Sequence, residues 1–337
     1  MLIAIVAVVG VAAGGVVLYG RSQLEAPAAA HGTPVTVQVT SGESVDQVAA
    51  DLQTHGLIRS SFWFGWFARF KGLGGSLHSG AFKLDSGMGA SAIISRLSTA
   101  PDVQTVKITF AEGATATQMA KKVGDSGLGV TADQYLAEVR TGSFSAPFLT
   151  GRPAGASLEG FLYPDTYSIP QGSTAHQIVQ MQLDDFGQRV GTLLAAPPHG
   201  LTGYQLVVMA SIIEREAQFN DDRPKVASAI YNRLAQNMAL QSDATVAYGL
   251  GITGREPTAA EFKIDTPYNS YLHAGLVPTP IANPGLPSLQ GAAQPAQTTY
   301  LFWVADGCGH NHYAVTLAEH DQQVSRYLNS PCPSPTP

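Results

Sequence analysis

A strand–turn–helix pattern occurs twice near the start of this chain, with a constant offset of 71 positions between the copies. Each copy begins with apolar residues at every second position, which is typical of a half-buried strand, and continues with apolar residues at helical spacing. Gly42 and Gly113 mark the two turns, and Ser44 and Thr115 follow them as candidate helix caps. The pattern restricts this part of the chain to units in which a strand packs against a helix. The paired positions are Val35/Val106, Val37/Ile108, Val39/Phe110, Val45/Ala116, Gln47/Gln118, Val48/Met119, Ala49/Ala120, Leu52/Val123, Gly56/Gly127 and Leu57/Leu128.

The first copy predicts a module over residues 34–105, and the second copy with its following loop covers residues 106–157. A unit of this kind resembles the LysM-like module of cell-wall proteins. A generic α+β unit that only packs the protein together fits the pattern equally well, because the repeat contains no reactive side chains. Both interpretations stay open.

The segment Phe62–Phe70 lies between the copies and contains six aromatic rings in nine residues. Such a run is typical of a helix buried against a sheet, and this is the favoured interpretation. Aromatic faces also stack on sugars, so a glycan-binding face is the alternative.

The first twenty residues are dominated by an uninterrupted apolar run, Leu2–Leu18. Its length is at the lower end of what a bilayer requires. A small-residue site at 28–30 is compatible with a cleaved signal peptide. Because Arg21 and Glu25 separate that site from the run, we expect an uncleaved membrane anchor over residues 1–20 and a linker over 21–33.

Composition excludes some classes of partner. The formal net charge is −6 and no basic stripe occurs, so nucleic acid is not expected as a partner.

The only cysteines are Cys308 and Cys332, which predict a disulfide in an oxidising compartment, with free thiols as the alternative. A metal site that adds His310, His312 and His320 lacks the paired ligand spacing of structural zinc and is the least favoured interpretation. No phosphate loop or dinucleotide fingerprint is present, and no cofactor is expected.

The clearest candidate for chemistry is Glu214, at the end of an apolar helical segment predicted over Tyr204–Ala217. Glu216 is two residues away and points to a different face, so the two cannot form a carboxylate pair on this helix. Glu216 is expected to be solvated or to hold a neighbouring loop. A carboxyl group against apolar surface retains its proton more readily, which is what a general acid needs. The alternative is that Glu214 merely begins the polar end of the helix.

Several segments around Glu214 occur in an order that resembles the YceG-like family of endolytic murein transglycosylases, over roughly residues 35–328. The turn at Phe110–Gly113 lacks the proline that is usual in the family, which concerns loop shape only. The segments that carry the resemblance are Leu158–Tyr167, Ala210–Glu216, Val226–Leu234, Leu240–Gly249, Pro267–Tyr271, Gly275–Leu276, Pro280–Gly285 and Tyr300–Ala305, followed by His312 and His320.

The resemblance implies a single-pass inner-membrane enzyme whose extracytoplasmic domain cuts the β-1,4 bond between N-acetylmuramic acid and N-acetylglucosamine in nascent strands. The expected product ends in 1,6-anhydro-N-acetylmuramic acid, and wall synthases are possible partners. Glu214 takes the position of the catalytic acid. Glu159 and Asp165 are the nearest candidates for a second acid. Candidate substrate-binding residues, each with a structural role as an equal alternative, are Gln241, Ser242, Asp243, Tyr248, Tyr268, Asn269, Glu159 and Asp165.

The chemistry is compatible with one acid, because the muramic acid C6 hydroxyl can serve as an intramolecular nucleophile. A hydrolytic muramidase would need a second carboxylate. A catalytically silent wall-binding protein is the third possibility. The expected fold is α+β, with an N-terminal membrane helix, a LysM-like α+β module, a mixed α/β catalytic domain over residues 158–330 and a flexible tail over 331–337.

Overall fold

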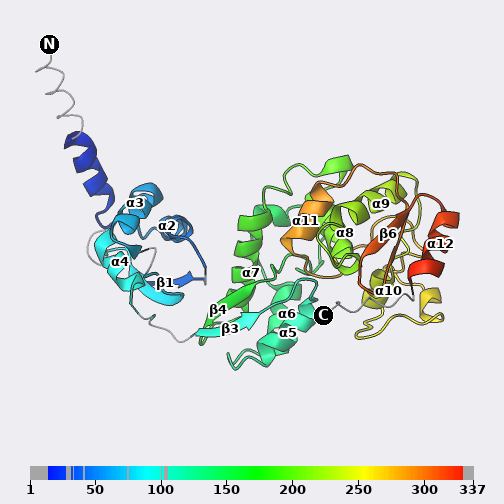
Figure 1. Ribbon diagram of the computed structural model, residues 1–337. Helices are drawn as coiled ribbons and strands as arrows, with labels where there is room; N and C mark the ends of the chain where they lie inside the picture. Colours follow the sequence, from blue (N-terminus) through cyan, green and yellow to red (C-terminus); the bar gives the residue numbers. More distant parts are fainter. Residues whose placement is uncertain are drawn as a thin grey trace, which may run out of the picture. The chain divides into compact units, whose positions relative to one another are not determined.

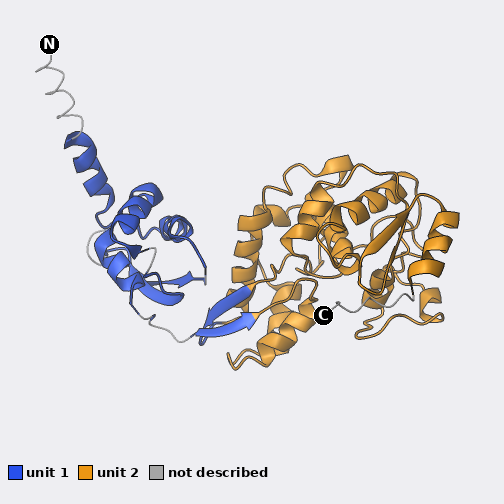
Figure 2. Cartoon of the chain, viewed as in Figure 1, with its two compact units in different colours: residues 1–108, 166–173 blue, residues 109–165, 174–337 orange. Residues whose placement is uncertain are grey.

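The computed structural model describes residues 14–27, 32, 34–40, 42–73, 76–99, 101 and 105–328. The chain is α+β and divides into two compact units (Figure 2). Unit 1 comprises residues 1–108 and 166–173, and unit 2 comprises residues 109–165 and 174–337. Residues 109–157, set apart by the repeat pattern, thus belong with the C-terminal part of the chain. The predicted tail at 331–337 lies outside the described residues.

Unit 1 is a strand–helix–helix–strand arrangement with an added helix (Figure 1). The two strands pair antiparallel, with Val37 opposite Phe82. Their inward side chains join apolar residues of all three helices in one core, which includes Leu52, Phe64 and Ile93. The elements are β1 (Pro34–Val39), α2 (Val45–Thr54), α3 (Ser61–Phe70), β2 (Gly80–Asp85) and α4 (Ala90–Leu97).

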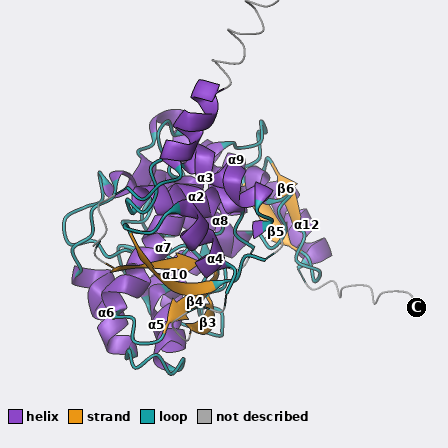
Figure 3. Cartoon of the chain, turned by 90° about the vertical axis from the view of Figure 1, so that its left-hand side faces the viewer, coloured by secondary structure: helices purple, strands orange, loops and turns teal. Residues whose placement is uncertain are grey.

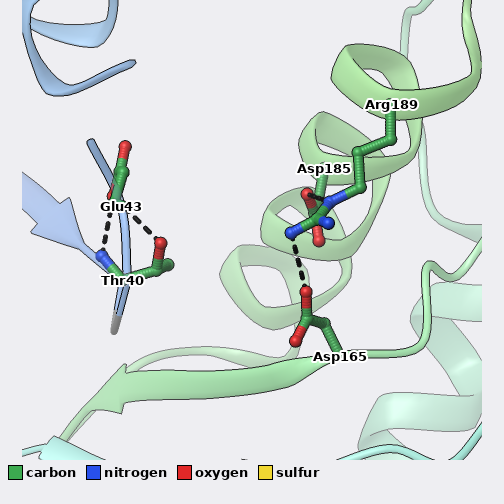
Figure 4. Close-up of polar contacts among 5 residues, drawn as sticks. All are labelled: Thr40, Glu43, Asp165, Asp185 and Arg189. Atoms are coloured by element: carbon green, nitrogen blue, oxygen red, sulfur yellow. Dashed lines mark hydrogen bonds and ion pairs between the residues drawn. The ribbon is translucent and has the colours of Figure 1, made fainter. Parts of the chain in front are cut away.

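Both copies of the repeat form the predicted strand, turn and helix. The second copy contributes β3 (Thr105–Thr109) and α5 (Ala116–Gly124). Ser44 and Thr115 each form a capping box with the glutamine three residues later, so both predicted caps are confirmed. Gly42 and Gly113 adopt positive φ angles of 87° and 73°, which explains the glycine at each turn. The turn of the first copy is closed by the Glu43 carboxylate, which accepts from the Thr40 amide and hydroxyl (Figure 4).

Strand β3 pairs with β4 (Thr166–Pro170) in a second two-stranded sheet. The pairing continues beyond β3, where the Phe110 amide donates to the Asp165 carbonyl at 3.0 Å. A third sheet pairs β5 (Phe302–Ala305) with β6 (Asn311–Ala314) in antiparallel orientation. Besides α5, unit 2 contains seven described helices (Figures 1 and 3), and short 3-10 turns lie at Pro147–Leu149, Pro198–Gly200 and Glu261–Lys263. The seven helices are α6 (Ala132–Thr141), α7 (Ala175–Val190), α8 (Gly203–Glu216), α9 (Arg223–Ala235), α10 (Asp243–Gly249), α11 (Leu286–Ala293) and α12 (Leu317–Tyr327).

Helix α8 is the central helix of unit 2, as its apolar sequence predicted. Leu206 to Ile213 are all buried. α8 packs against α9, α10 and α11. Its one polar residue within the apolar run, Ser211, is satisfied because its hydroxyl donates to the Val208 carbonyl and accepts from the Ile281 amide. The helix therefore holds its C-terminal end, with Glu214, in a fixed position.

The aromatic segment in α3 is divided between core and surface. Phe64 and Ala68 are buried in the core of unit 1, as the favoured interpretation predicted. Phe62, Trp66 and Phe70 are exposed, so the segment is not buried as a whole.

The N-terminal segment is helical over residues 14–23, and residues 1–13 of the expected anchor lie outside the described part. Among the described residues, no helix combines the length and apolar character that crossing a membrane requires.

Cys308 is disulfide-bonded, and Cys332, the other cysteine of the sequence, lies outside the described residues. The described residues contain no cluster of ligands suited to a metal ion. The nearby histidines make stacking contacts instead: His310 stacks on Phe219 and His312 on Tyr327.

Candidate active site

Glu214 lies in the last turn of α8 and its side chain is only 6% exposed. Both carboxylate oxygens have a donor. Arg223 forms an ion pair with Oε1 at 3.1 Å, and the Gly285 backbone amide donates to Oε2 at 3.0 Å. The immediate surroundings are thus polar, in contrast to the apolar contact that the sequence predicted. These two donors hold the carboxylate in one orientation.

Arg223 is itself fixed by its neighbours. It is the first residue of α9 and is 5% exposed. Its Nε donates to the Ser288 hydroxyl of α11 at 2.7 Å, and another of its nitrogens contacts Asn220. A buried arginine with this many partners has little freedom to leave the carboxylate. Helices α8, α9 and α11 together define the position of Glu214.

A second carboxylate, Glu112, lies beside Glu214 and was not predicted as a site residue. A Cβ atom at Gly285 would come within 2.0 Å of Glu112 Oε1, so this carboxyl group rests directly on the Gly285 backbone. The same Gly285 donates its amide to Glu214. Because both carboxylates contact the backbone of the same residue, Gly285, they are no more than about 8 Å apart.

The charge on Glu112 is influenced by this environment. Partial burial and the negative charge of Glu214 raise the pKa of Glu112, and the positive charge of Arg223 opposes this rise.

One signal in the sequence could have identified Glu112 as a site residue. The repeat pairs Glu112 with Ser41, so the second copy has a carboxylate at its turn where the first has a hydroxyl.

Glu159 is a buried organising residue, 4% exposed. Its carboxylate accepts from the Ala116 amide at 2.9 Å, from Asn283 Nδ2 at 2.7 Å and from the Tyr248 hydroxyl at 3.4 Å. Burial raises the pKa of Glu159 to about 7, although these hydrogen bonds lower it. Glu159 therefore joins the start of α5 to the loop before α11.

Asp165 has a different environment from the other acids. It pairs with Arg189 of α7 at 2.7 Å, and Arg189 also contacts Asp185, as Figure 4 shows. The Asp165 side chain is 39% exposed. Because Arg189 balances its charge, Asp165 has a structural role in this ion pair.

Glu216 holds the neighbouring loop, one of the two roles that the sequence predicted. It accepts from the Ser242 hydroxyl at 2.5 Å and from Trp303 Nε1 at 3.2 Å. Burial raises the pKa of Glu216, and these two donors oppose the effect. Ser242 is buried and begins α10, so its role is structural.

A cleft of about 1430 Å³ borders this carboxylate cluster. Four predicted residues line it: Glu159, Gln241, Asp243 and Tyr248. Asp243 also accepts from the Tyr271 hydroxyl at 2.5 Å. Arg215 and Glu216 line the cleft as well, whereas the buried Glu214 does not. The other lining residues include Thr115, Gln118, Arg233, Thr253, Arg255, Glu256, Ile281, Trp303, His320 and Asp321.

Two further predicted residues support loops. The Tyr268 hydroxyl bonds to Thr279 Oγ1 at 2.7 Å, and its ring packs edge-on against Tyr248. Asn269 is fully buried, and its amide donates to the carbonyls of Phe262 and Ile264. Neither lines the cleft.

Acidic side chains that line a cleft are typical of the class of carboxylate-dependent enzymes. Comparison with known proteins narrows this class. The chain belongs to the YceG-like family, whose model matches residues 37–326.

Its relatives include an endolytic murein transglycosylase of Bacillus subtilis (strain 168), 32% identical over 330 residues that cover 94% of this chain and 91% of that protein. Another of the same name, from Streptococcus pneumoniae serotype 2, is 28% identical over 88% of this chain and 59% of that protein. The 2.6 Å crystal structure of a YceG-like protein from Listeria monocytogenes matches with a TM-score of 0.58 and 27% identity, over 87% of this chain and 99% of that one.

Proposed function

We propose that this protein is an endolytic lytic transglycosylase that cleaves the β-1,4 bond between N-acetylmuramic acid and N-acetylglucosamine in peptidoglycan strands. The observation that carries the proposal is the fixed, nearly buried Glu214, which lies in the last turn of α8 next to Arg215 and Glu216, two residues that line the cleft. The names of the relatives, which match most of this chain, support the substrate class.

Glu214 is the acid and base of the proposed reaction. In its protonated form it donates a proton to the glycosidic oxygen as the bond from that oxygen to C1 of N-acetylmuramic acid breaks. The C6 hydroxyl of the same sugar attacks C1, and the Glu214 carboxylate takes its proton. A 1,6-anhydro end and a free N-acetylglucosamine hydroxyl result, and the enzyme returns to its starting state.

The contacts of Glu214 suit this role. Arg223 and Gly285 fix the carboxylate in one orientation, and because the nucleophile belongs to the substrate, orientation supplies much of the acceleration. Gln241, Asp243 and Tyr248 on the cleft wall are the polar groups available to the sugars.

One observation favours a second candidate, a hydrolytic muramidase. Glu112 lies no more than about 8 Å from Glu214, so a second carboxylate is within the range of separations that glycoside hydrolases use. Product chemistry separates the two reactions, because an anhydro end is lighter than a hydrolysed end by one water molecule.

The test is to incubate the full chain and its Glu214→Gln variant with nascent and mature peptidoglycan strands and to read the products by mass spectrometry. Anhydro ends formed by the parent and absent with Glu214→Gln are expected. Reducing ends would establish the muramidase. A folded parent that cleaves neither kind of strand would refute both activities and leave a wall-binding role.

We also infer that the apolar run Leu2–Leu18 anchors the protein in the plasma membrane with its active site outside the cytoplasm, where peptidoglycan and the wall synthases that extend it are found. Unit 1, whose strand–helix–helix–strand order agrees with a LysM-like module, would then lie next to the anchor. Flotation of the full chain with vesicles tests this inference, and a chain that stays in the aqueous fraction contradicts it.

A further inference from the structure

Unit 1 exposes a face of aromatic rings on α3. Phe62, Trp66 and Phe70 are 72%, 55% and 75% exposed. They are spaced four residues apart, so they line one side of the helix, and Phe64 and Ala68 face the core from the other side. A surface of three large apolar rings in one row is unusual for a protein face that remains in water.

These rings continue toward the N-terminal helix. Trp66 stacks on Phe70 with centroids 5.9 Å apart, and Trp63 contacts both Trp66 and Phe62 edge-on. Trp63 in turn meets Tyr19, with centroids 6.4 Å apart. The row of rings therefore runs from α3 to the end of the apolar sequence segment.

The N-terminal helix is apolar at the point where it meets this row. Val16, Val17, Leu18 and Tyr19 are each more than half exposed. A Cβ atom at Gly20 would come within 2.8 Å of the Trp63 ring, so the ring packs directly on the helix backbone at this residue. The glycine allows the two apolar surfaces to join without a gap.

The connection from this helix to unit 1 is tied down at several points. Leu24 packs against the core, and its carbonyl accepts from the Ala90 amide at 2.9 Å. Arg59 donates to the Ala26 carbonyl at 3.0 Å. The rings of α3 are thus held at a fixed short distance from Leu18, where the apolar run ends.

A lipid surface fits this face better than a glycan. Tryptophan and tyrosine are enriched at the membrane–water boundary, where their rings can be buried and their polar atoms stay hydrated. Trp66 and Phe70 lie parallel, with 7° between their planes. Each ring therefore covers one face of the other, and that face is not available to stack on a sugar. Lys71 follows the last ring of the row, where a long basic side chain can extend toward headgroups, whereas Arg69 is paired with Asp46.

We propose that the aromatic face of α3, Phe62, Trp66 and Phe70, lies in the headgroup region of the membrane and seats unit 1 on the bilayer surface. The proposal rests on the membrane anchor inferred above, and it assigns that surface a second contact with lipid. Unit 1 is then held against the membrane by its own rings in addition to the N-terminal segment.

Tryptophan fluorescence in vesicles tests the proposal with the full chain. The sequence has three tryptophans, so Trp63→Phe with Trp303→Phe leaves Trp66 as the only emitter. The vesicles contain phospholipids brominated near the headgroup or, separately, near the chain ends. Flotation first verifies that the protein is bound, and circular dichroism verifies that it is folded.

The matched control moves the tryptophan to the opposite side of unit 1. Lys83 is exposed on β2 between the core residues Phe82 and Leu84, so its side chain points away from the core against which α3 packs. Trp63→Phe, Trp66→Phe, Trp303→Phe and Lys83→Trp together give this control. As a second readout, Trp66→Phe alone in the otherwise unchanged chain should lower the fraction of its emission that lipid bromines quench.

We expect bromines near the headgroup to quench Trp66 more than bromines near the chain ends, and to leave the tryptophan at position 83 unquenched. A chain that floats but shows equal quenching at both positions overturns the proposed surface and leaves the anchor intact. A chain that does not float overturns both. If glycan strands without vesicles shift the Trp66 emission, the face binds glycan and the proposal is wrong.

Discussion

Replacing Glu112 by glutamine tests whether the second carboxylate acts on the first. The substitution removes one negative charge within about 8 Å of Glu214 and keeps the shape of the side chain. At that separation two charges interact by about 0.5 kcal/mol in water and about 2 kcal/mol at an effective dielectric constant of about 20. Because Glu112 is exposed, we take about 1 kcal/mol, which corresponds to roughly a fivefold change in an equilibrium constant.

The expected effect is on the alkaline limb of the pH profile of kcat/KM. A neighbouring negative charge helps a carboxyl group to keep its proton, and a general acid must be protonated to act. Without Glu112 the limb should move to lower pH, so that activity above the limb falls about fivefold.

Two further variants make the assay specific. Gly285 has a backbone φ of −74°, which alanine adopts readily. In the Gly285→Ala variant the new Cβ atom would occupy the place of the Glu112 carboxyl group and displace it. The variant should therefore shift the limb in the same direction. Asp165→Asn removes an acid that pairs with Arg189 and should leave the limb unchanged.

An unchanged limb in both Glu112→Gln and Gly285→Ala would refute the electrostatic reasoning. A loss of activity in Glu112→Gln as complete as that in Glu214→Gln would assign Glu112 a direct part in the reaction, and reducing ends in the parent's products would then make it the base of a hydrolase.

Three other predictions concern stability, each measured by chemical denaturation. Burial raises the pKa of Glu159 from 4.5 to about 7, so the contribution of Glu159 to the free energy of unfolding is complete below pH about 4.5 and is lost as the pH rises through about 7. The loss amounts to up to about 3 kcal/mol, and the Glu159→Gln variant should not show it. A variant with the same pH dependence of stability as the parent would contradict this prediction. Arg223→Met should cost about 3–5 kcal/mol because it leaves the Glu214 carboxylate buried without its cation, and adding Glu214→Gln should recover part of that cost; no recovery would contradict the ion-pair explanation. Phe64→Ala should destabilise unit 1 by about 3–5 kcal/mol, whereas Phe62→Ala on the same helix should change stability by less than about 0.5 kcal/mol, and equal effects would mean that the α3 faces are misassigned.

Features that depend on neighbouring residues could be predicted from the sequence. The two strand–turn–helix copies, their caps at Ser44 and Thr115, and the buried helix α8 all follow from periodicity and capping within a few residues. The position of Glu214 at the end of that helix was predicted for the same reason.

Contacts between distant segments could not be predicted in this way. Glu112 and Gly285 reach Glu214 from separate loops, and nothing in the local pattern of either loop indicates the meeting. Glu159 and Asp165 looked alike in the sequence as acids in one motif. Only the structure shows that one is buried among hydrogen-bond donors and the other is paired with Arg189.

The side chain of Asn283 determines when the active site can exist during synthesis. Its amide oxygen accepts from Gly160 and Leu162, and its amide nitrogen donates to Glu159 and to the Ala114 carbonyl, 169 residues earlier in the chain. A growing polypeptide that has passed Arg223 but not yet reached Gly285 possesses the acid and its arginine partner but lacks the backbone amide that binds the second carboxylate oxygen. The Glu214 carboxylate therefore acquires both of its donors only when most of unit 2 has been made.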